Sequence, residues 1–433
     1  MTRARKWLLG LGIFIGVLAV AAGVLLSLIP SDEELAQRAA GELQAALGVP
    51  VTIGALHWQL LPSPRVEVEN AATGQPQPIE VKKLTAHVNT AALWQRRLKL
   101  DWVEVQGAVV PQLSLRGLGR PQADAPDNKA GKFTVDAVPL ARIDFHEVTW
   151  ITRRGTRVVY DGEADFDAGW RPRTARLRLP HAASATNLTL TRQGQEDRWE
   201  AQASVGGGTA HGQVQLQAAD KGELRLSGKL QPRNVEVASA LQAFNRNSII
   251  SGKASGETSL SGRGDSLAEL AQSLHTTTAF TMGRSTLRRF DLDKAIRSLG
   301  RDHAGETPLD GITGRLDTQN TPQGMVVTYS GLKTQSGAFS ASGKARLANR
   351  QIDAEFAVDL IDGVVGVPLK ITGPVNQIKV SVPASAIAGA AVGTAVLPGI
   401  GTALGARIGA AIGQLFGSEP AAAKRPAAPK KAP

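Results

Sequence analysis

Residues 213–227 read Gln213-Val214-Gln215-Leu216-Gln217, a short turn-forming stretch, and then Glu223-Leu224-Arg225-Leu226-Ser227. Apolar and polar side chains alternate in both halves, and successive side chains of a β-strand point to opposite faces of its sheet. The stretch between them, Ala219-Asp220-Lys221-Gly222, is rich in residues that favour turns. The segment therefore predicts two antiparallel strands with one apolar face and one solvated face.

The same two-residue period extends along most of the chain on both sides of this hairpin. It recurs at Arg65-Val66-Glu67-Val68-Glu69, at Asn187-Leu188-Thr189-Leu190-Thr191, and again over 356–360 and 378–382. The predicted fold class is therefore mainly β, an antiparallel sheet with one hidden face. The apolar members of the pattern are the candidates to line that face: Val66, Val68, Leu188, Leu190, Val214, Leu216, Leu224, Leu226, Phe356, Val358, Ile378 and Val380.

Helices are expected to be few and short. Capping residues and periodicity predict one helix after Pro30, and four shorter ones at 90–97, 234–245, 266–274 and 292–299. So few helices cannot cover many strands. Two arrangements stay open: a sandwich or barrel with a packed β-core, or a curled sheet whose groove holds an apolar ligand such as an acyl chain.

Residues 7–29 carry no charge and are long enough to cross a bilayer. Arg3, Arg5 and Lys6 precede this segment, so the positive-inside rule places the N-terminus in the cytoplasm and the body across the membrane. A cleaved signal peptide is the alternative, but the apolar run continues past the small-residue site at 19–21. The expectation is a retained single-pass transmembrane anchor.

Near the other end, between 384 and 417, glycines recur at four-residue steps: Gly389, Gly393, Gly401, Gly405, Gly409, Gly413 and Gly417. On a helix they form one smooth stripe along which a second helix packs closely in lipid. Pro398 interrupts the segment, and neither half reaches the roughly 20 residues that a span needs. A kinked span, a hairpin in one leaflet, a surface helix and a buried helix closing the sheet all stay open, as does the choice between inner and outer membrane.

The net charge of +11 is a feature that nucleic-acid-binding proteins often have. Many of the cations lie beside the two apolar segments, at 3–6 and at 424–431, where anionic lipid headgroups attract positive charge. The expected partners are therefore phospholipid and membrane, with an envelope protein as a further partner, and not nucleic acid.

The sequence predicts no enzyme, no cofactor and no metal site. It has no cysteine, and its seven histidines do not pair at metal-ligand spacing. It contains no nucleophile elbow, no phosphate-binding loop and no dinucleotide-binding glycine motif in a suitable context. Asp291 and Asp293 could bind a cation, but capping of the helix predicted at 292–299 explains them better.

Three stretches occur in a characteristic order. The first is the anchor and amphipathic helix, followed by Gly48-Val49-Pro50-Val51-Thr52-Ile53-Gly54 and Pro62-Ser63-Pro64-Arg65-Val66-Glu67-Val68. The second runs from 81–88 through 98–105, and the third covers Leu230 to Pro383, including Ser285-Thr286-Leu287-Arg288-Arg289-Phe290-Asp291-Leu292 and Val367-Pro368-Leu369-Lys370-Ile371-Thr372-Gly373. Together they resemble the AsmA family of Gram-negative envelope proteins.

This resemblance implies an elongated, curled sheet with a hydrophobic groove, similar to bridge-like lipid-transfer proteins. It implies an inner-membrane anchor, a periplasmic body and a role in outer-membrane biogenesis, through phospholipid transport or the targeting and assembly of outer-membrane proteins. The family offers no catalytic residues to carry over. The alternative is a membrane-anchored scaffold with a packed β-core and no lipid path.

The expected domain organisation follows these features. Residues 1–30 form the cytoplasmic N-terminus and anchor, 31–116 an N-terminal unit, 117–132 a loop, and 133–383 the β-rich body. Residues 384–417 form the Gly/Ala-rich membrane segment, and 418–433 a basic tail whose composition predicts disorder.

Overall fold

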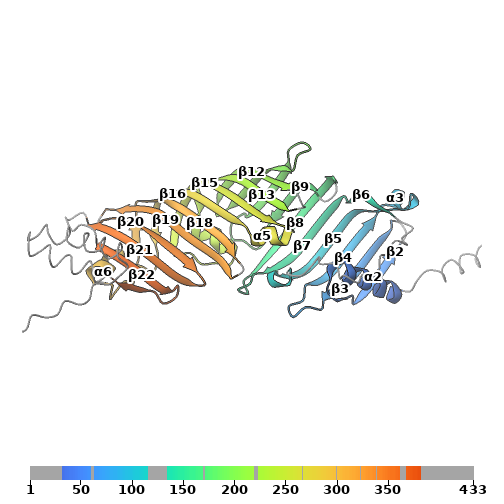
Figure 1. Ribbon diagram of the computed structural model, residues 1–433, viewed down its shortest axis with the longest axis horizontal. Coiled ribbons are helices and arrows are strands. Elements are labelled where there is room, and N and C mark those ends of the chain that lie inside the picture. The colour runs from blue at the N-terminus through green and yellow to red at the C-terminus, as the bar shows by residue number, and fades with distance from the viewer. Residues whose placement is uncertain are drawn as a thin grey trace, which may run out of the picture. The chain divides into compact units, whose positions relative to one another are not determined.

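The computed structural model describes residues 32–59, 63–115, 134–168, 171–218, 223–265, 267–298, 300–321, 323–337, 339–360 and 367–381. The predicted anchor at 7–29, the predicted loop at 117–132, the glycine-spaced segment at 384–417 and the tail at 418–433 lie outside these ranges. The described chain is mainly β with a few short helices (Figure 1). It divides into two compact units, one ending at Ala175 and one beginning at Arg176.

The first unit begins with a helix and continues as strands. Its elements are α2 (Asp32–Leu47), β1 (Val51–Thr52), β2 (Ala55–Gln59), β3 (Arg65–Thr73), β4 (Glu80–Val88), α3 (Thr90–Trp94), β5 (Arg97–Pro111), the 3₁₀ turn η1 (Gln112–Leu115), β6 (Thr134–Leu140), β7 (Arg142–Ile151) and β8 (Arg157–Ala168). Helix α2 packs against β1 and β2. The strand β9 (Arg171–Arg178) contains the boundary between the units.

Within its described residues, the second unit is a longer run of strands with three short helices. Its elements are β10 (Asn187–Arg192), β11 (Arg198–Val205), β12 (Gly208–Ala218), β13 (Leu224–Arg233), β14 (Val235–Glu236), α4 (Val237–Ala243), β15 (Ile250–Gly264), α5 (Leu267–Gln272), β16 (His275–Leu287), α6 (Leu292–Arg297), β17 (Thr307–Leu309), β18 (Gly311–Thr321), β19 (Gly324–Ser336), β20 (Phe339–Ala348), β21 (Gln351–Leu360), β22 (Val367–Pro374) and β23 (Lys379–Ser381).

Among the described strand pairs with a known register, the expected antiparallel pairing holds for all but two, and both of these involve β5 in the first unit. Strand β5 pairs in parallel with β6 and with β7. A parallel pair requires a long crossover between its strands, and residues 116–133 lie between β5 and β6. Alternation of side chains does not reveal strand direction, so the sequence pattern could not predict these exceptions.

All five helices lie where capping and periodicity predict them, within a few residues. The clearest case is α6, whose N-cap is Asp291, because the Asp291 carboxylate accepts a hydrogen bond of 3.0 Å from the Lys294 backbone N–H. Its buried residues Leu292, Ala295 and Ile296 are spaced i, i+3 and i+4 and therefore lie on one face of the helix.

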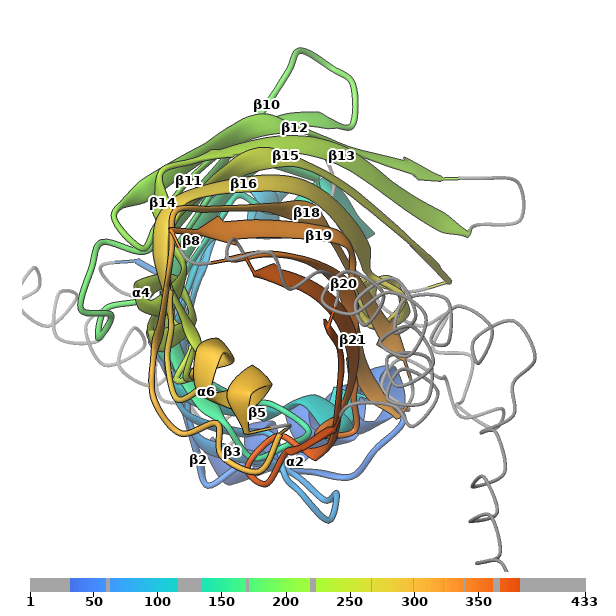
Figure 2. The same ribbon diagram turned by 90° about the vertical axis from the view of Figure 1, so that its left-hand side faces the viewer.

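Helix α6 organises the core of the second unit. Figure 2 shows the sheet of this unit bending round, with α6 on its concave side. Its three buried residues pack in one cluster with side chains from β16 and from β18 to β22, including Phe339, Val358 and Leu369. Val358 is 0% exposed and Leu369 1% exposed, so this end of the sheet is filled by protein.

Candidate functional site

The strand registers of the second unit align the alternating side chains into one continuous face. Directly paired residues on neighbouring strands point to the same side of a sheet. One row of pairs runs Leu190, Ala201, Gly212, Leu230, Thr258, Thr278, Leu316, Tyr329, Ala345, Ala354, Ile371 and Val380. A parallel row runs Trp199, Val214, Gly228, Leu260, Thr276 and Thr318. We call the side of the sheet that carries these rows the apolar face.

The opposite side of the same strands is polar. In β13 the residues that alternate with Leu224, Leu226 and Leu230 are Arg225, Ser227, Lys229 and Gln231, all exposed. In β12 the partners of these polar residues are Gln217, Gln215, Gln213 and His211. The sheet therefore has the one-sided character that the sequence predicted.

The apolar face differs in burial along the sheet. Over β10, β12, β13 and β15 its large side chains are half-buried: Leu188, Leu190, Val214, Leu216, Leu224, Leu226, Leu230 and Leu260. Over β21 and β22 the same face is packed beneath α6, where Val358, Leu369 and Ile371 belong to the core cluster. One part of the face thus keeps solvent contact, and the other is closed by protein.

Two other helices contact this face near the ends of its strands. Helix α4 packs against β11 and β15, and α5 packs against β13 and β15. Leu270 of α5 is buried above Gly262, where an added Cβ would lie 3.1 Å from the Leu270 carbonyl oxygen. Trp199 and Ala201 of β11 are also buried, at 6% and 2% exposure. Of the half-buried leucines, Leu224, Leu226, Leu230 and Leu260 lie on strands that these helices contact, β13 and β15.

Helix α4 is held against the sheet by one carboxylate. Glu236 accepts hydrogen bonds from the backbone N–H of Ser239, at 2.6 Å, and of Gly252 in β15, at 2.8 Å. Burial alone would raise the pKa of Glu236, but these backbone donors outweigh it, so the pKa lies below its ordinary value. Glu236 is therefore both the helix cap and the link to the neighbouring strand.

The predicted lining residues divide between these environments. Leu188, Leu190, Val214, Leu216, Leu224 and Leu226 form part of the half-buried region. Val358 is inside the core cluster, and Phe356, Ile378 and Val380 pack against it, so these four contact protein in this structure. Val66 and Val68 lie half-buried in β3 of the first unit, opposite Ala86 and Leu84 of β4.

Sequence reasoning missed several members of the apolar face. Trp199, Leu260, Leu316 and Tyr329 lie on it, and for Trp199 the alternation Arg198-Trp199-Glu200-Ala201-Gln202 is a sequence signal that could have identified it. The ring of Tyr329 meets that of Phe280 edge-on, with centroids 6.5 Å apart, and burial raises the pKa of the Tyr329 hydroxyl. The tripeptide Ser-Gly-Lys recurs at 227, 251 and 342, each time inside a strand, in β13, β15 and β20.

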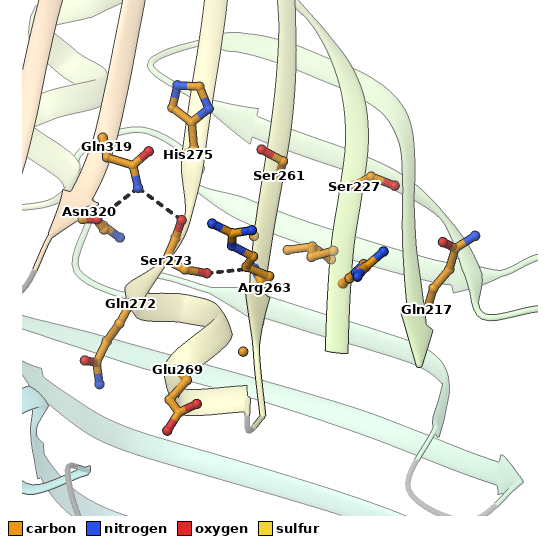
Figure 3. A pocket seen from close by; sticks show the side chains of 14 residues that line it. Gln217, Ser227, Ser261, Arg263, Glu269, Gln272, Ser273, His275, Gln319 and Asn320 are labelled. Atoms are coloured by element: carbon orange, nitrogen blue, oxygen red, sulfur yellow. Dashed lines mark hydrogen bonds between the residues drawn. The ribbon is translucent and has the colours of Figure 1, made fainter. Parts of the chain in front are cut away.

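A concavity of about 1010 Å³ lies beside α5, where β12, β13, β15, β16 and β18 approach it (Figure 3). Its lining includes Arg225 and Arg263, which face one another on paired strands, and Leu226 of the apolar face. His275, also in the lining, contacts Asp317 at 2.8 Å. Burial alone would raise the pKa of Asp317, but hydrogen bonds from Thr277 and His275 leave it lowered.

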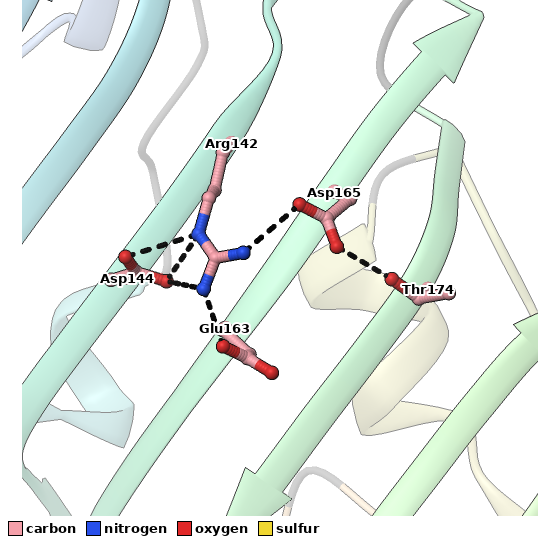
Figure 4. Close-up of polar contacts among 5 residues, drawn as sticks. All are labelled: Arg142, Asp144, Glu163, Asp165 and Thr174. Carbon is pink, nitrogen blue, oxygen red and sulfur yellow. Dashed lines mark hydrogen bonds and ion pairs between the residues drawn. The ribbon is translucent and has the colours of Figure 1, made fainter.

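The first unit carries a charged cluster on β7 and β8 (Figure 4). The Arg142 guanidinium contacts the carboxylates of Asp144 at 3.0 Å and Asp165 at 3.4 Å, and also that of Glu163. Thr174 donates a hydrogen bond of 2.8 Å to Asp165. Hydrogen bonding to Asp144 is the main cause of a raised Arg142 pKa. Arg142 thus links three carboxylates from two neighbouring strands, which indicates a structural role.

No group of three or more potential metal-ligating side chains occurs within the part of the chain that the structure describes. Asp291 caps α6, and Asp293 pairs with Arg297 at 2.8 Å, so both side chains have structural partners. Among the described residues no helix is both long enough and apolar enough to cross a membrane. Comparison with known proteins finds no matching family model, no matching curated protein and no matching solved structure.

Proposed function

We propose that the half-buried region of the apolar face binds lipid acyl chains. On this proposal the protein is a non-enzymatic, AsmA-like envelope protein that is anchored in the inner membrane and has its body in the periplasm. It supports outer-membrane biogenesis by moving phospholipid or by assisting the assembly of outer-membrane proteins. This function requires no chemical reaction. It requires an apolar surface whose side chains lie on the same side of neighbouring strands.

The observation that carries the proposal is the aligned, half-buried row of leucine and valine side chains over β10, β12, β13 and β15. Exposed apolar area costs roughly 25 cal/mol for each Å² left in water, so partly exposed leucine and valine side chains gathered on one face favour an apolar partner. An acyl chain fits because it is uniformly apolar and makes no demand for hydrogen bonds.

The sequence context supports the cellular setting. The predicted anchor at 7–29, the predicted membrane segment at 384–417 and the order of the AsmA-like stretches favour a protein of the Gram-negative envelope. These features bear on location, whereas the apolar face bears on the ligand. The two parts of the proposal therefore have separate support.

Photo-crosslinking in cells tests the ligand directly. A photoreactive amino acid is placed at Leu226, on the apolar face, and in a matched variant at Ser227, the next residue, which points to the solvated side. We expect phospholipid adducts from position 226, and likewise from 190 and 260, but none from 227. Equal lipid labelling at 226 and 227, or adducts to protein alone at all apolar positions, would contradict the proposal.

A second candidate function is a membrane-anchored interaction scaffold. It is favoured by the packed core around α6, which closes part of the apolar face with protein. On this alternative, crosslinks from Leu226 join it to an envelope protein and never to lipid. The same experiment therefore separates the two functions.

A further inference from the structure

Trp94 is the most exposed of the large apolar side chains that the structure describes. Its side chain is 88% exposed, whereas the next, Ile249, is 53% exposed. An indole left in water loses much of the stabilisation that its large apolar surface would give on burial. Isolated exposed apolar residues are common, but an indole this exposed leaves its whole ring available for contact with a partner.

The structure holds Trp94 outward through its own local contacts. Helix α3 is short, and the Asn89 side chain caps it by accepting a hydrogen bond of 2.8 Å from the Ala92 backbone N–H. Ala92 is 4% exposed and fixes the inner side of the turn. Arg96 then adopts a left-handed backbone conformation, with φ of 54°, and turns the chain into β5. The indole is therefore presented by an ordered turn.

The residues that follow Trp94 are basic. The sequence from 94 reads Trp94-Gln95-Arg96-Arg97-Leu98-Lys99, with Arg96 and Arg97 both exposed. The nearest acid in sequence, Asp101, accepts a hydrogen bond of 2.8 Å from the Asn89 side chain. An indole beside arginines matches the headgroup layer of an anionic bilayer, where amphipathic rings settle and cations meet phosphate.

Strand register places α3 near the point where the predicted anchor meets the folded unit. Asp32, which follows the predicted anchor at 7–29, contacts the His57 imidazole at 3.1 Å. Across the sheet, His57 of β2 pairs with Glu67 of β3, and Glu67 pairs with Thr85 of β4. Helix α3 begins at Thr90, five residues after Thr85 along the chain. At about 3.4 Å for each residue and 4.8 Å for each strand, Asp32 and Thr90 lie on the order of 20 Å apart. A bilayer that receives the anchor is within reach of α3.

From these observations we infer that Trp94, together with Arg96 and Arg97, forms a second contact with the surface of an anionic membrane, separate from the anchor. This contact fixes the orientation of the first unit on the bilayer. It rests on the membrane setting of the proposed function but not on lipid binding by the apolar face. A basic, tryptophan-bearing patch could also receive an acidic protein, and the experiment below separates that outcome.

The absence of cysteine in the chain allows a single probe to be placed without other changes. An environment-sensitive fluorophore is attached to the variant Ala91→Cys, on the exposed side of α3, with Trp94 intact. The control carries the fluorophore at Arg154→Cys, in the exposed turn between β7 and β8. The full-length protein is reconstituted into vesicles of phosphatidylcholine alone or with one quarter phosphatidylglycerol, containing a lipid-attached quencher.

We expect strong quenching at position 91 in the anionic vesicles and little at position 154. When the labelled Ala91→Cys protein also carries Trp94→Ala, or Gln in place of both Arg96 and Arg97, the quenching at position 91 should fall several-fold. A higher salt concentration should also lower the quenching when Trp94, Arg96 and Arg97 are intact. Equal quenching at 91 and 154, or no change with Trp94→Ala, would overturn the inference. A fluorophore at 91 that responds only to added envelope protein would assign the patch to a protein partner instead. Failure of lipid crosslinking from Leu226 leaves this result unaffected.

Discussion

Gly343 in β20 lies directly opposite Phe356 in β21, and the phenyl ring occupies the space that a side chain at Gly343 would need. A Cβ at this position would overlap both the ring and the Glu355 carbonyl oxygen. Glycine within a strand marks a place of close approach, and here it lets an aromatic side chain lie flat on the bent sheet. The concave side of the second unit thus depends on small residues as well as on apolar ones.

The variant Gly343→Ala is expected to destabilise the protein by about 1–3 kcal/mol, because the ring or the neighbouring strand must shift to admit a methyl group. Chemical denaturation followed by circular dichroism measures this change. Gly283→Ala is the matched control, since that glycine is also in a strand but has no atom within 4 Å of an added Cβ. An unchanged midpoint for Gly343→Ala would show that the strands are not closely packed here.

Two leucine truncations distinguish the closed and half-buried parts of the apolar face. Leu369 is 1% exposed beneath α6, so Leu369→Ala is expected to cost about 2–5 kcal/mol through lost burial and a residual cavity. Leu226 is only partly buried, so Leu226→Ala is expected to cost less than Leu369→Ala, at about 1.5 kcal/mol or below, since part of its side chain already contacts solvent. Urea denaturation of both variants checks the difference, and equal costs would indicate a face that is packed throughout.

Replacing Glu236 by Gln removes the charge that two backbone donors stabilise, and we expect a loss of about 1–2 kcal/mol at neutral pH. Because the folded-state pKa is lowered, the native state binds fewer protons than the unfolded state, so this stabilisation is present above the unfolded pKa of about 4.3. It is lost as pH falls through the folded-state pKa. The difference in the free energy of unfolding between the parent protein and Glu236→Gln should therefore become smaller below about pH 4.3. Chemical denaturation at a series of pH values measures this difference. Glu257→Gln, exposed on the solvated side of β15, should show no such dependence.

The variant Arg142→Met leaves three carboxylates without their shared cation. Arg142 is 40% exposed, so screening by solvent limits the expected loss to about 1 kcal/mol at low ionic strength. The loss should shrink as salt screens the repulsion among Asp144, Glu163 and Asp165. Lys344→Met breaks an ion pair with Glu355 in which the Lys344 side chain is 70% exposed, and it should change stability by less than about 0.5 kcal/mol. A salt-independent loss at Arg142 would point to packing of its side chain in place of charge.

Local sequence signals predicted the elements well because they depend on neighbours in the chain. Asp291 caps α6 as its position before Leu292 indicated, and the alternation around Leu216 and Leu226 places both on one face of paired strands. The parallel pairing of β5 with β7 and the division of the chain at Ala175 could not be predicted in this way, since both depend on contacts between distant segments.

The sequence by itself determined that this protein is mainly β, one-sided in its strands and poor in helices, because a period of two fixes which side chains share a face. It also determined the short helices, because caps and turns act within a few residues. Only the tertiary structure decided which part of the apolar face is closed. Leu226 and Val358 carry the same alternating pattern, yet α6 covers Val358 and leaves Leu226 half-buried. Helix α6, which covers Val358, lies about sixty residues before it in sequence. A contact between such distant segments depends on the tertiary fold and cannot be predicted from the local pattern.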